Sequence, residues 1–181
     1  MLSAFVTDRA HRAVEAIGAA ARREVGPYSP REQRPLRGYL AIAGAYTAAV
    51  AVGSLAVRTR GQRLPHIATR DVALIGCATF QLSHMLAKRP IASPLRAPFT
   101  VFDGVTGPAE LQEEVRGDGL RHAVGELLTC PFCLAHWVAT AFGFAFVLAP
   151  EPTRVVAALL SAEALANFAQ LAHTAVEHGV E

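Results

Sequence analysis

The sequence has 181 residues, of which 52% are hydrophobic and 18% are charged. Soluble domains usually carry about 25% charged residues, so the composition excludes a disordered chain and argues against an ordinary water-soluble fold. Three cysteines are too few for a disulfide-rich secreted scaffold, and a net charge of +2 gives no reason to expect nucleic acid as a partner.

Residues 1–37 are predicted to form a basic amphipathic helix followed by a linker. Within residues 1–25, apolar side chains recur at helical spacing with arginines between them. Asp8 and Glu15 interrupt any apolar run of the length that a signal peptide needs. Two interpretations remain open: the helix lies on a membrane surface or a partner, or it is a solvated helix packed on its own protein. Gly26 and three prolines then mark the linker.

Residues 38–181 are predicted to form one transmembrane domain with four spans. The first span has twenty residues without a charge, and as a helix it covers about 30 Å, the thickness of a bilayer core. The second is more polar, since it contains Gln81 and His84, and it suits a membrane only if its polar side faces other helices. The predicted spans are residues 38–57, 71–87, 133–149 and 153–175.

Arginine supplies almost all of the positive charge, with sixteen Arg and one Lys, and together with the high alanine content this suggests a GC-rich bacterial genome. Counted by loop, twelve of these cations fall before the first span and in the loop 88–129, and five fall on the other side. The positive-inside rule places both termini and this loop in the cytoplasm. We therefore expect an all-α, multi-pass protein of the bacterial cytoplasmic (inner) membrane, with the lipid bilayer as one partner.

Cys130 and Cys133 form a Cys-Pro-Phe-Cys motif that leaves three chemistries open. If the third span begins at Pro131, Cys130 is its N-cap, where the helix dipole favours a thiolate and hence redox chemistry. His136 follows one turn later, so a zinc site is an alternative, although it needs a fourth ligand. The third alternative is that both cysteines pack as small apolar side chains. No βαβ pattern precedes the motif, which excludes a thioredoxin fold, and no other cofactor is predicted.

Glu163 lies near the middle of the fourth predicted span, and Asn167 and Gln170 share its helix face. An ionisable residue inside a membrane suggests function, and with His84 as a partner this stripe would suit a proton or ion path. The favoured alternative is a protonated Glu163 hydrogen-bonded within the bundle or at an oligomer interface, because four short spans leave little room for a solute pathway.

Arg96 lies between two prolines. Because a residue that precedes a proline is restricted to extended conformations, we expect this segment to be stiff and extended. We expect it to bind a lipid phosphate or to pair with Glu126 or with the acidic run 110–118. Residues 119–129 carry a short helical pattern that runs into Cys130.

Three stretches together resemble the bacterial membrane-protein family known as domain of unknown function 1360: SPLRAPFT, then EEVRG with GLRHAVGELLTCPFC, then WVAT. The resemblance covers about residues 70–175 and implies a small multi-span bacterial membrane protein of uncharacterised activity. The family pattern maps onto Arg96, Pro98, Phe99, Gly125, Glu126, Cys130, Pro131, Cys133 and Trp137.

Packing features are abundant in this sequence and catalytic motifs are few, so whether it is an enzyme stays open. We predict a membrane-embedded interaction or scaffold subunit that binds a protein partner or a second copy through stripes of small residues, such as Ala158, Ala162 and Ala166. One alternative is a thiol-disulfide or quinone-linked redox protein that uses the two cysteines of the motif. Another is a small proton or ion transporter that uses Glu163.

Overall fold

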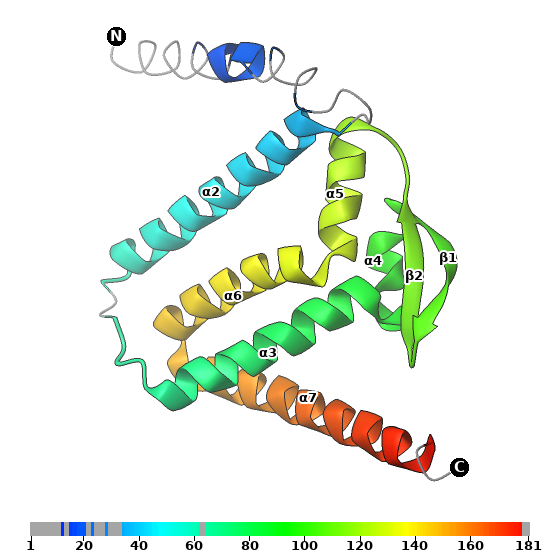
Figure 1. The fold of residues 1–181 in the computed structure, drawn as a ribbon. Helices are drawn as coiled ribbons and strands as arrows, with labels where there is room; N and C mark the ends of the chain where they lie inside the picture. The colour runs from blue at the N-terminus through cyan, green and yellow to red at the C-terminus, as the bar shows by residue number, and fades with distance from the viewer. Residues whose placement is uncertain are drawn as a thin grey trace.

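The computed structural model describes residues 12, 15–20, 23, 28, 34–61 and 64–178. The amphipathic helix predicted in residues 1–25 lies largely outside the described residues. The chain is mostly helical and includes one small β-hairpin (Figure 1). The elements are α2 (Leu36–Thr59), α3 (Thr69–Lys88), the short 3-10 helix η1 (Pro90–Ala92), α4 (Ser93–Arg96), β1 (Thr100–Gly107), β2 (Glu110–Val115), α5 (Gly119–Thr129), α6 (Pro131–Leu148) and α7 (Pro150–His178).

Three helices, α2, α6 and α7, are long and apolar enough to cross a membrane. The segment expected as the second span is the helix α3, but α3 is not one of these three helices. Its polar residues Asp71, Gln81 and Ser83 are buried inside the protein. The structure therefore has three apolar helices of spanning length, and the segment expected as a further span is a more polar helix packed against two of them.

The most buried contacts lie between α3 and its neighbours α6 and α7, which pack on either side of it (Figure 1). Ala78 of α3 and Ala157 of α7 are both fully buried, and small side chains at such a contact let two helices approach closely. Val138 and Phe142 of α6 complete this core. The core thus lies around α3. This helix is more polar than α2, α6 and α7, because several of its polar side chains are buried inside the protein.

An ion pair joins the beginnings of α3 and α7. Arg154 Nε donates to Asp71 Oδ1 at 3.0 Å, and the Asp71 side chain is only 2% exposed. The other carboxylate oxygen of Asp71 accepts the backbone N–H of Ala68 at 3.2 Å, which satisfies one of the free donors at the start of the helix. The pair fixes the register of the two helices where they begin.

The helix α2 stands apart from this core and contacts α5 and α6 at a few points (Figure 1). At Gly38 a Cβ atom would lie 2.6 Å from Ala123 Cβ, so glycine is required for the close approach to α5. Tyr46 Oη lies 2.7 Å from Thr140 Oγ1 of α6. Most of the remaining surface of α2 is exposed.

A β-hairpin occupies the middle of the segment 88–129, and this corrects the all-α prediction. The two strands pair antiparallel, with Thr100 opposite Val115 and Gly107 opposite Glu110. An isolated two-stranded hairpin is marginally stable in water, and here it packs against α5 and the end of α3. Local sequence patterns do not predict these tertiary contacts, so they do not predict the hairpin. The helix predicted at residues 119–129 is confirmed as α5.

Candidate functional site

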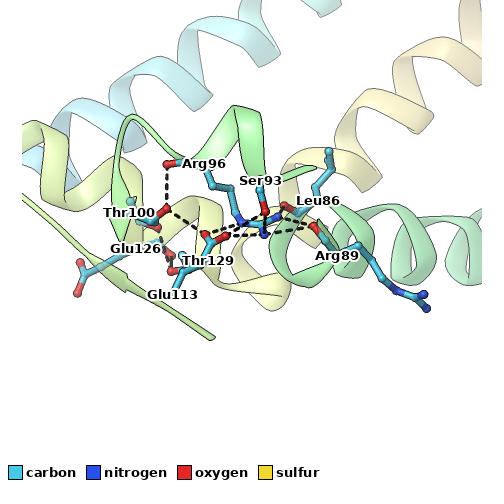
Figure 2. Close-up of polar contacts among 9 residues, drawn as sticks. Leu86, Arg89, Ser93, Arg96, Thr100, Glu113, Glu126 and Thr129 are labelled. Carbon is cyan, nitrogen blue, oxygen red and sulfur yellow. Dashed lines mark hydrogen bonds and ion pairs between the residues drawn. The ribbon is translucent and has the colours of Figure 1, made fainter. Parts of the chain in front are cut away.

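Arg96 lies at the junction of α3, α4 and the hairpin, where Figure 2 shows it surrounded by oxygen acceptors. Its Nε donates to Glu113 Oε2 at 2.8 Å and its Nη2 donates to Glu113 Oε1 at 2.9 Å. This is the bidentate arrangement that makes arginine–carboxylate pairs strong and directional. The two side chains are 1% and 7% exposed, so a buried ion pair connects α4 to β2.

The other donors of Arg96 close the C-terminal end of α3. Nη1 donates to the carbonyl of Leu86 at 2.7 Å, and both Nη atoms donate to the carbonyl of Arg89 at 3.2 Å. The Leu86 carbonyl has no helical donor, because Pro90 stands four residues later and lacks an N–H. The acidic partner of Arg96 thus lies in the run 110–118, as expected. Hydrogen bonds from the Arg96 side chain also join the end of α3 to the hairpin.

Glu113 is held in its ionised form by the groups around it. Burial opposes ionisation of the carboxyl, but hydrogen bonds from Arg96 and Thr100 outweigh burial and keep the pKa of Glu113 below its ordinary value. Thr100 Oγ1 donates to Glu113 Oε2 at 2.9 Å, and Ser93 Oγ donates to Oε1 at 3.3 Å. The cluster is fully hydrogen-bonded and leaves Arg96 no free face for a ligand, so its arrangement is that of a structural brace.

The residues after Arg96 connect this brace to α5. The carbonyl of Pro98 accepts a hydrogen bond from Arg121 Nη2 at 2.6 Å. The carbonyl of Phe99 accepts one from the backbone N–H of Arg116 at 2.9 Å. At Gly125 a Cβ would lie 3.0 Å from the Phe99 carbonyl oxygen. The RAPF segment and Gly125 therefore form one packed unit, which holds α5 in the position that leads into the cysteine motif.

Cys130 and Cys133 are joined as a disulfide at the beginning of α6, with their Cα atoms 5.3 Å apart. The helix begins at Pro131 and Cys130 is its N-cap, as the sequence indicates. The backbone N–H of Cys133 donates to Cys130 Sγ at 3.2 Å. Cys130 is half-buried and Cys133 is exposed, so the pair presents one sulfur at the surface and keeps the other against the helix end.

A cavity of about 480 Å³ opens beside the cysteine pair, between α2, α5 and α6. Glu126 lies on its wall, where Tyr39 Oη donates to Oε2 at 2.5 Å and Arg34 Nη1 donates to Oε1 at 2.9 Å. Glu126 thus pairs with residues of the α2 end and not with Arg96. The cavity is lined by Tyr39, Ile42, Ala123, Glu126, Leu127, Thr129, Cys130 and Cys133.

His136 does not join the two cysteines. It is exposed on α6, and its ring centroid lies 4.7 Å from that of Tyr46 on α2. Trp137 packs edge-on against the same tyrosine at 5.2 Å. Among residues 34–61 and 64–178, no three His, Cys, Asp or Glu side chains lie together in a way that would hold a metal ion.

The polar residues predicted on one face of α7 have different environments. Asn167 Nδ2 donates to Gln81 Oε1 of α3 at 3.2 Å. Glu163 is exposed, and within the described part of the chain its carboxylate makes neither a hydrogen bond nor an ion pair. Gln170 is exposed and lines a second cavity of about 300 Å³ between α3, α7 and the hairpin turn.

His84 faces this second cavity and not Glu163. Its Nε2 lies 3.1 Å from Glu110 Oε1 at the hairpin turn, and its ring stacks on Phe80 at 5.8 Å between centroids. Phe168 of α7 also stacks on Phe80, with their ring centroids 5.7 Å apart. The polar groups expected to form one proton path therefore do not contact one another: Asn167 and His84 have different partners, and Glu163 is exposed.

Comparison with known proteins identifies the family of this chain. The family described as "Protein of unknown function (DUF1360)" matches residues 74–173. The chain belongs to this family. That confirms the resemblance on the RAPF and ELLTCPFC segments. The chain is also distantly related to the sporulation protein YjcA of Bacillus subtilis (strain 168), with 28% identity over 99 residues that cover 53% of this chain and 84% of the relative. No solved structure matches the chain.

The sequence did not single out Glu113 or Tyr39, the partners that complete the two motifs. Glu113 stands in a run of acidic residues, but residues 111, 113 and 115 alternate as one face of a strand. That alternation is the pattern that would have pointed to an inward Glu113. For Tyr39 no local pattern exists, because its contact with Glu126 joins residues 87 positions apart.

Proposed function

We propose that this protein is a membrane-embedded assembly subunit that associates with a second copy along the exposed face of α7. The observation that supports this most is Glu163. It lies 13 residues from the start of a 29-residue apolar helix, or about 20 Å along the axis. It is exposed, and no group in the part of the chain that the structure describes binds its carboxylate.

An exposed carboxyl at this depth is costly in a lipid environment. A carboxylate at the bilayer centre costs at least about 2.5 kcal/mol by insertion scales, and such residues almost always face protein or water. Since Asn167 and His84 already bind Gln81 and Glu110, the remaining way to cover Glu163 is another protein surface. This favours assembly over conduction through Glu163.

A second copy of the chain fits this face. Ala158, Ala162 and Ala166 are exposed at intervals of four residues, and they turn away from the side of α7 that packs on α3. Small residues at this spacing let two helices approach closely. In a two-fold interface each Glu163 would meet the same region of the other copy. Burial there raises the pKa of a carboxyl group, so each Glu163 can keep its own proton and hydrogen-bond to the other copy, and neither is left charged in an apolar setting.

The same proposal includes the topology. If α3 crosses the membrane beside α6 and α7, the chain has an even number of spans and both termini lie on one side. The end of the bundle that carries α5, the hairpin and the start of α2 also carries six of the ten arginines in residues 34–61 and 64–178. By the positive-inside rule this end faces the cytoplasm. The hairpin and α5 then form a small cytoplasmic cap.

The test measures the oligomeric state of the full-length chain in mild detergent by analytical ultracentrifugation. The wild type should be a dimer. Ala162→Leu should shift it to monomer because the added bulk separates the helices, and Glu163→Leu should weaken association by roughly three- to thirtyfold, the value of one interhelical hydrogen bond. Glu163→Gln should retain the dimer, since an amide still bonds across the interface.

Ala51→Leu on α2 is the matched control. It adds the same side chain to another exposed alanine of an apolar helix and should leave the dimer unchanged. A wild-type protein that is monomeric at every concentration would contradict the proposal. So would an Ala162→Leu variant that associates as the wild type does, or a complex formed only with a different membrane protein.

A further inference from the structure

The cysteine pair and the cavity beside it have no part in the proposed assembly, and their geometry supports a chemistry of its own. We propose that Cys130 and Cys133 are a thiol-disulfide exchange site for a neutral, apolar dithiol. The inference does not depend on α7 or on the oligomeric state, because both sulfurs lie at the other face of the molecule, on the wall formed by α2, α5 and α6.

The two sulfurs differ in the way that exchange requires. Cys133 is exposed and open to an attacking thiolate, whereas Cys130 is half-buried at the N-cap of α6. Cys130 Sγ already accepts the N–H of Cys133 at 3.2 Å, and it lies at the positive end of the helix dipole. These two interactions stabilise a thiolate on Cys130, so Cys130 is the better leaving group when the disulfide is opened.

The exchange balances as a two-electron transfer. One thiolate of the dithiol attacks Cys133 Sγ, a new S–S bond forms to the dithiol, and the Cys130–Cys133 bond breaks with its electron pair going to Cys130. The second thiol of the substrate loses its proton to solvent. Its thiolate then attacks the first substrate sulfur, which is bonded to Cys133 in the mixed disulfide, and Cys133 is released. The substrate leaves as a disulfide and the pair is reduced; the released protons re-protonate the cysteine sulfurs.

The cavity decides what kind of dithiol fits. Most of its wall beside the sulfurs is apolar, formed by Ile42, Ala123 and Leu127. The one carboxylate on the wall, Glu126, is already bound by Tyr39 and Arg34. Phe132, between the two cysteines, is 88% exposed and offers an aromatic contact next to Cys133. These features favour a substrate with an uncharged apolar body over a hydrophilic thiol.

The experiment follows reduction of the pair in the full-length protein carrying Cys77→Ser, which removes the exposed free cysteine. Dihydrolipoamide is the probe for an apolar dithiol, and glutathione at the same thiol concentration is the hydrophilic comparison. We expect dihydrolipoamide to reduce the pair at least about tenfold faster than glutathione does. Phe132→Ser should slow dihydrolipoamide by a larger factor than it slows glutathione, since the lost aromatic contact serves the apolar substrate.

A second measurement tests the unequal sulfurs. In the Cys77→Ser, Cys133→Ser variant, alkylation of Cys130 should show a midpoint at least about one pH unit below the ordinary free-thiol value of about 8.5. Glu163→Leu, which tests the assembly proposal, should leave both results unchanged.

Three outcomes would overturn the proposal. One is a pair that stays oxidised in excess dihydrolipoamide until the protein is unfolded, which is the behaviour of a structural disulfide. The second is equal reduction rates with dihydrolipoamide and glutathione. The third is an alkylation midpoint for Cys130 at the ordinary free-thiol value of about 8.5. A wild-type protein that stays monomeric bears on the assembly proposal alone.

Discussion

Removing Arg96 is the most severe single change that the structure predicts for the fold. The Arg96 and Glu113 side chains are 1% and 7% exposed, so Arg96→Ala leaves a buried carboxylate without its cation. Breaking a buried ion pair from one side costs about 3–5 kcal/mol. The carbonyls of Leu86 and Arg89 lose their donors in the same step, which places the expected loss of unfolding free energy at the upper end of that range.

The assay is equilibrium unfolding in detergent micelles, followed by far-UV circular dichroism. Arg96→Met and Glu113→Leu are measured singly and together as a double-mutant cycle. Each single change should cost about 3–5 kcal/mol, whereas the double change should cost much less than their sum, because an apolar pair of similar volume can replace a buried ion pair.

Glu151→Gln is the control, since Glu151 forms an ion pair with Arg154 but is 81% exposed. Exposed pairs contribute about 0–1 kcal/mol, so this variant should unfold almost as the wild type does. An Arg96→Ala variant that loses less than about 1 kcal/mol, or single effects that simply add in the cycle, would refute the argument that the buried pair braces the hairpin.

Three further predictions concern the same structural unit and the helix ends. Because the folded-state pKa of Glu113 lies below its ordinary value of 4.5, its contribution to stability is complete above that pH and is lost as the pH falls through the lower, folded-state pKa; Glu113→Gln should flatten the acid limb of a stability-against-pH curve, and an unchanged limb would contradict this. Gly125→Ala should destabilise by about 1–3 kcal/mol, since its Cβ would lie 2.5 Å from Val115 Cγ1, and the added change Val115→Ala should restore part of the loss in the same unfolding assay. Asp71→Ala should cost about 3 kcal/mol because Asp71 is buried against Arg154; a midpoint of thermal unfolding equal to that of the wild type would show that the pair does not hold the helix ends.

The brace and the cysteine pair are connected through the backbone. Arg96 and Glu113 hold the hairpin on the end of α3, and the carbonyl of Pro98 accepts a hydrogen bond from Arg121 of α5. The carbonyl of Phe99 accepts one from the backbone N–H of Arg116, just after β2, and α5 runs directly into Cys130. The two segments that carry the family resemblance are thus parts of one structural unit. The RAPF segment positions α5, and α5 leads into the cysteine motif.

The sequence by itself determined the long helices and the position of the cysteine motif. The segment around Arg96 is not extended as expected but forms the short helix α4. A run of apolar residues as long as 38–57 or 133–149 specifies a helix for a membrane whatever surrounds it, since the backbone must satisfy its own hydrogen bonds there. The N-cap position of Cys130 is equally local, because Pro131 and the helical pattern after it define where α6 begins.

Only the tertiary structure decided the hairpin, the partner of Arg96 and the isolation of Glu163. A two-stranded hairpin depends on contacts with elements outside it, and Arg96 had several acidic candidates of similar spacing along the chain. The choice among them is made by burial, which lets only a fully hydrogen-bonded pair persist. Glu163 was expected near polar neighbours of α3, but the rotation of α7 on α3 gives those neighbours to Asn167 and leaves Glu163 on the outer face.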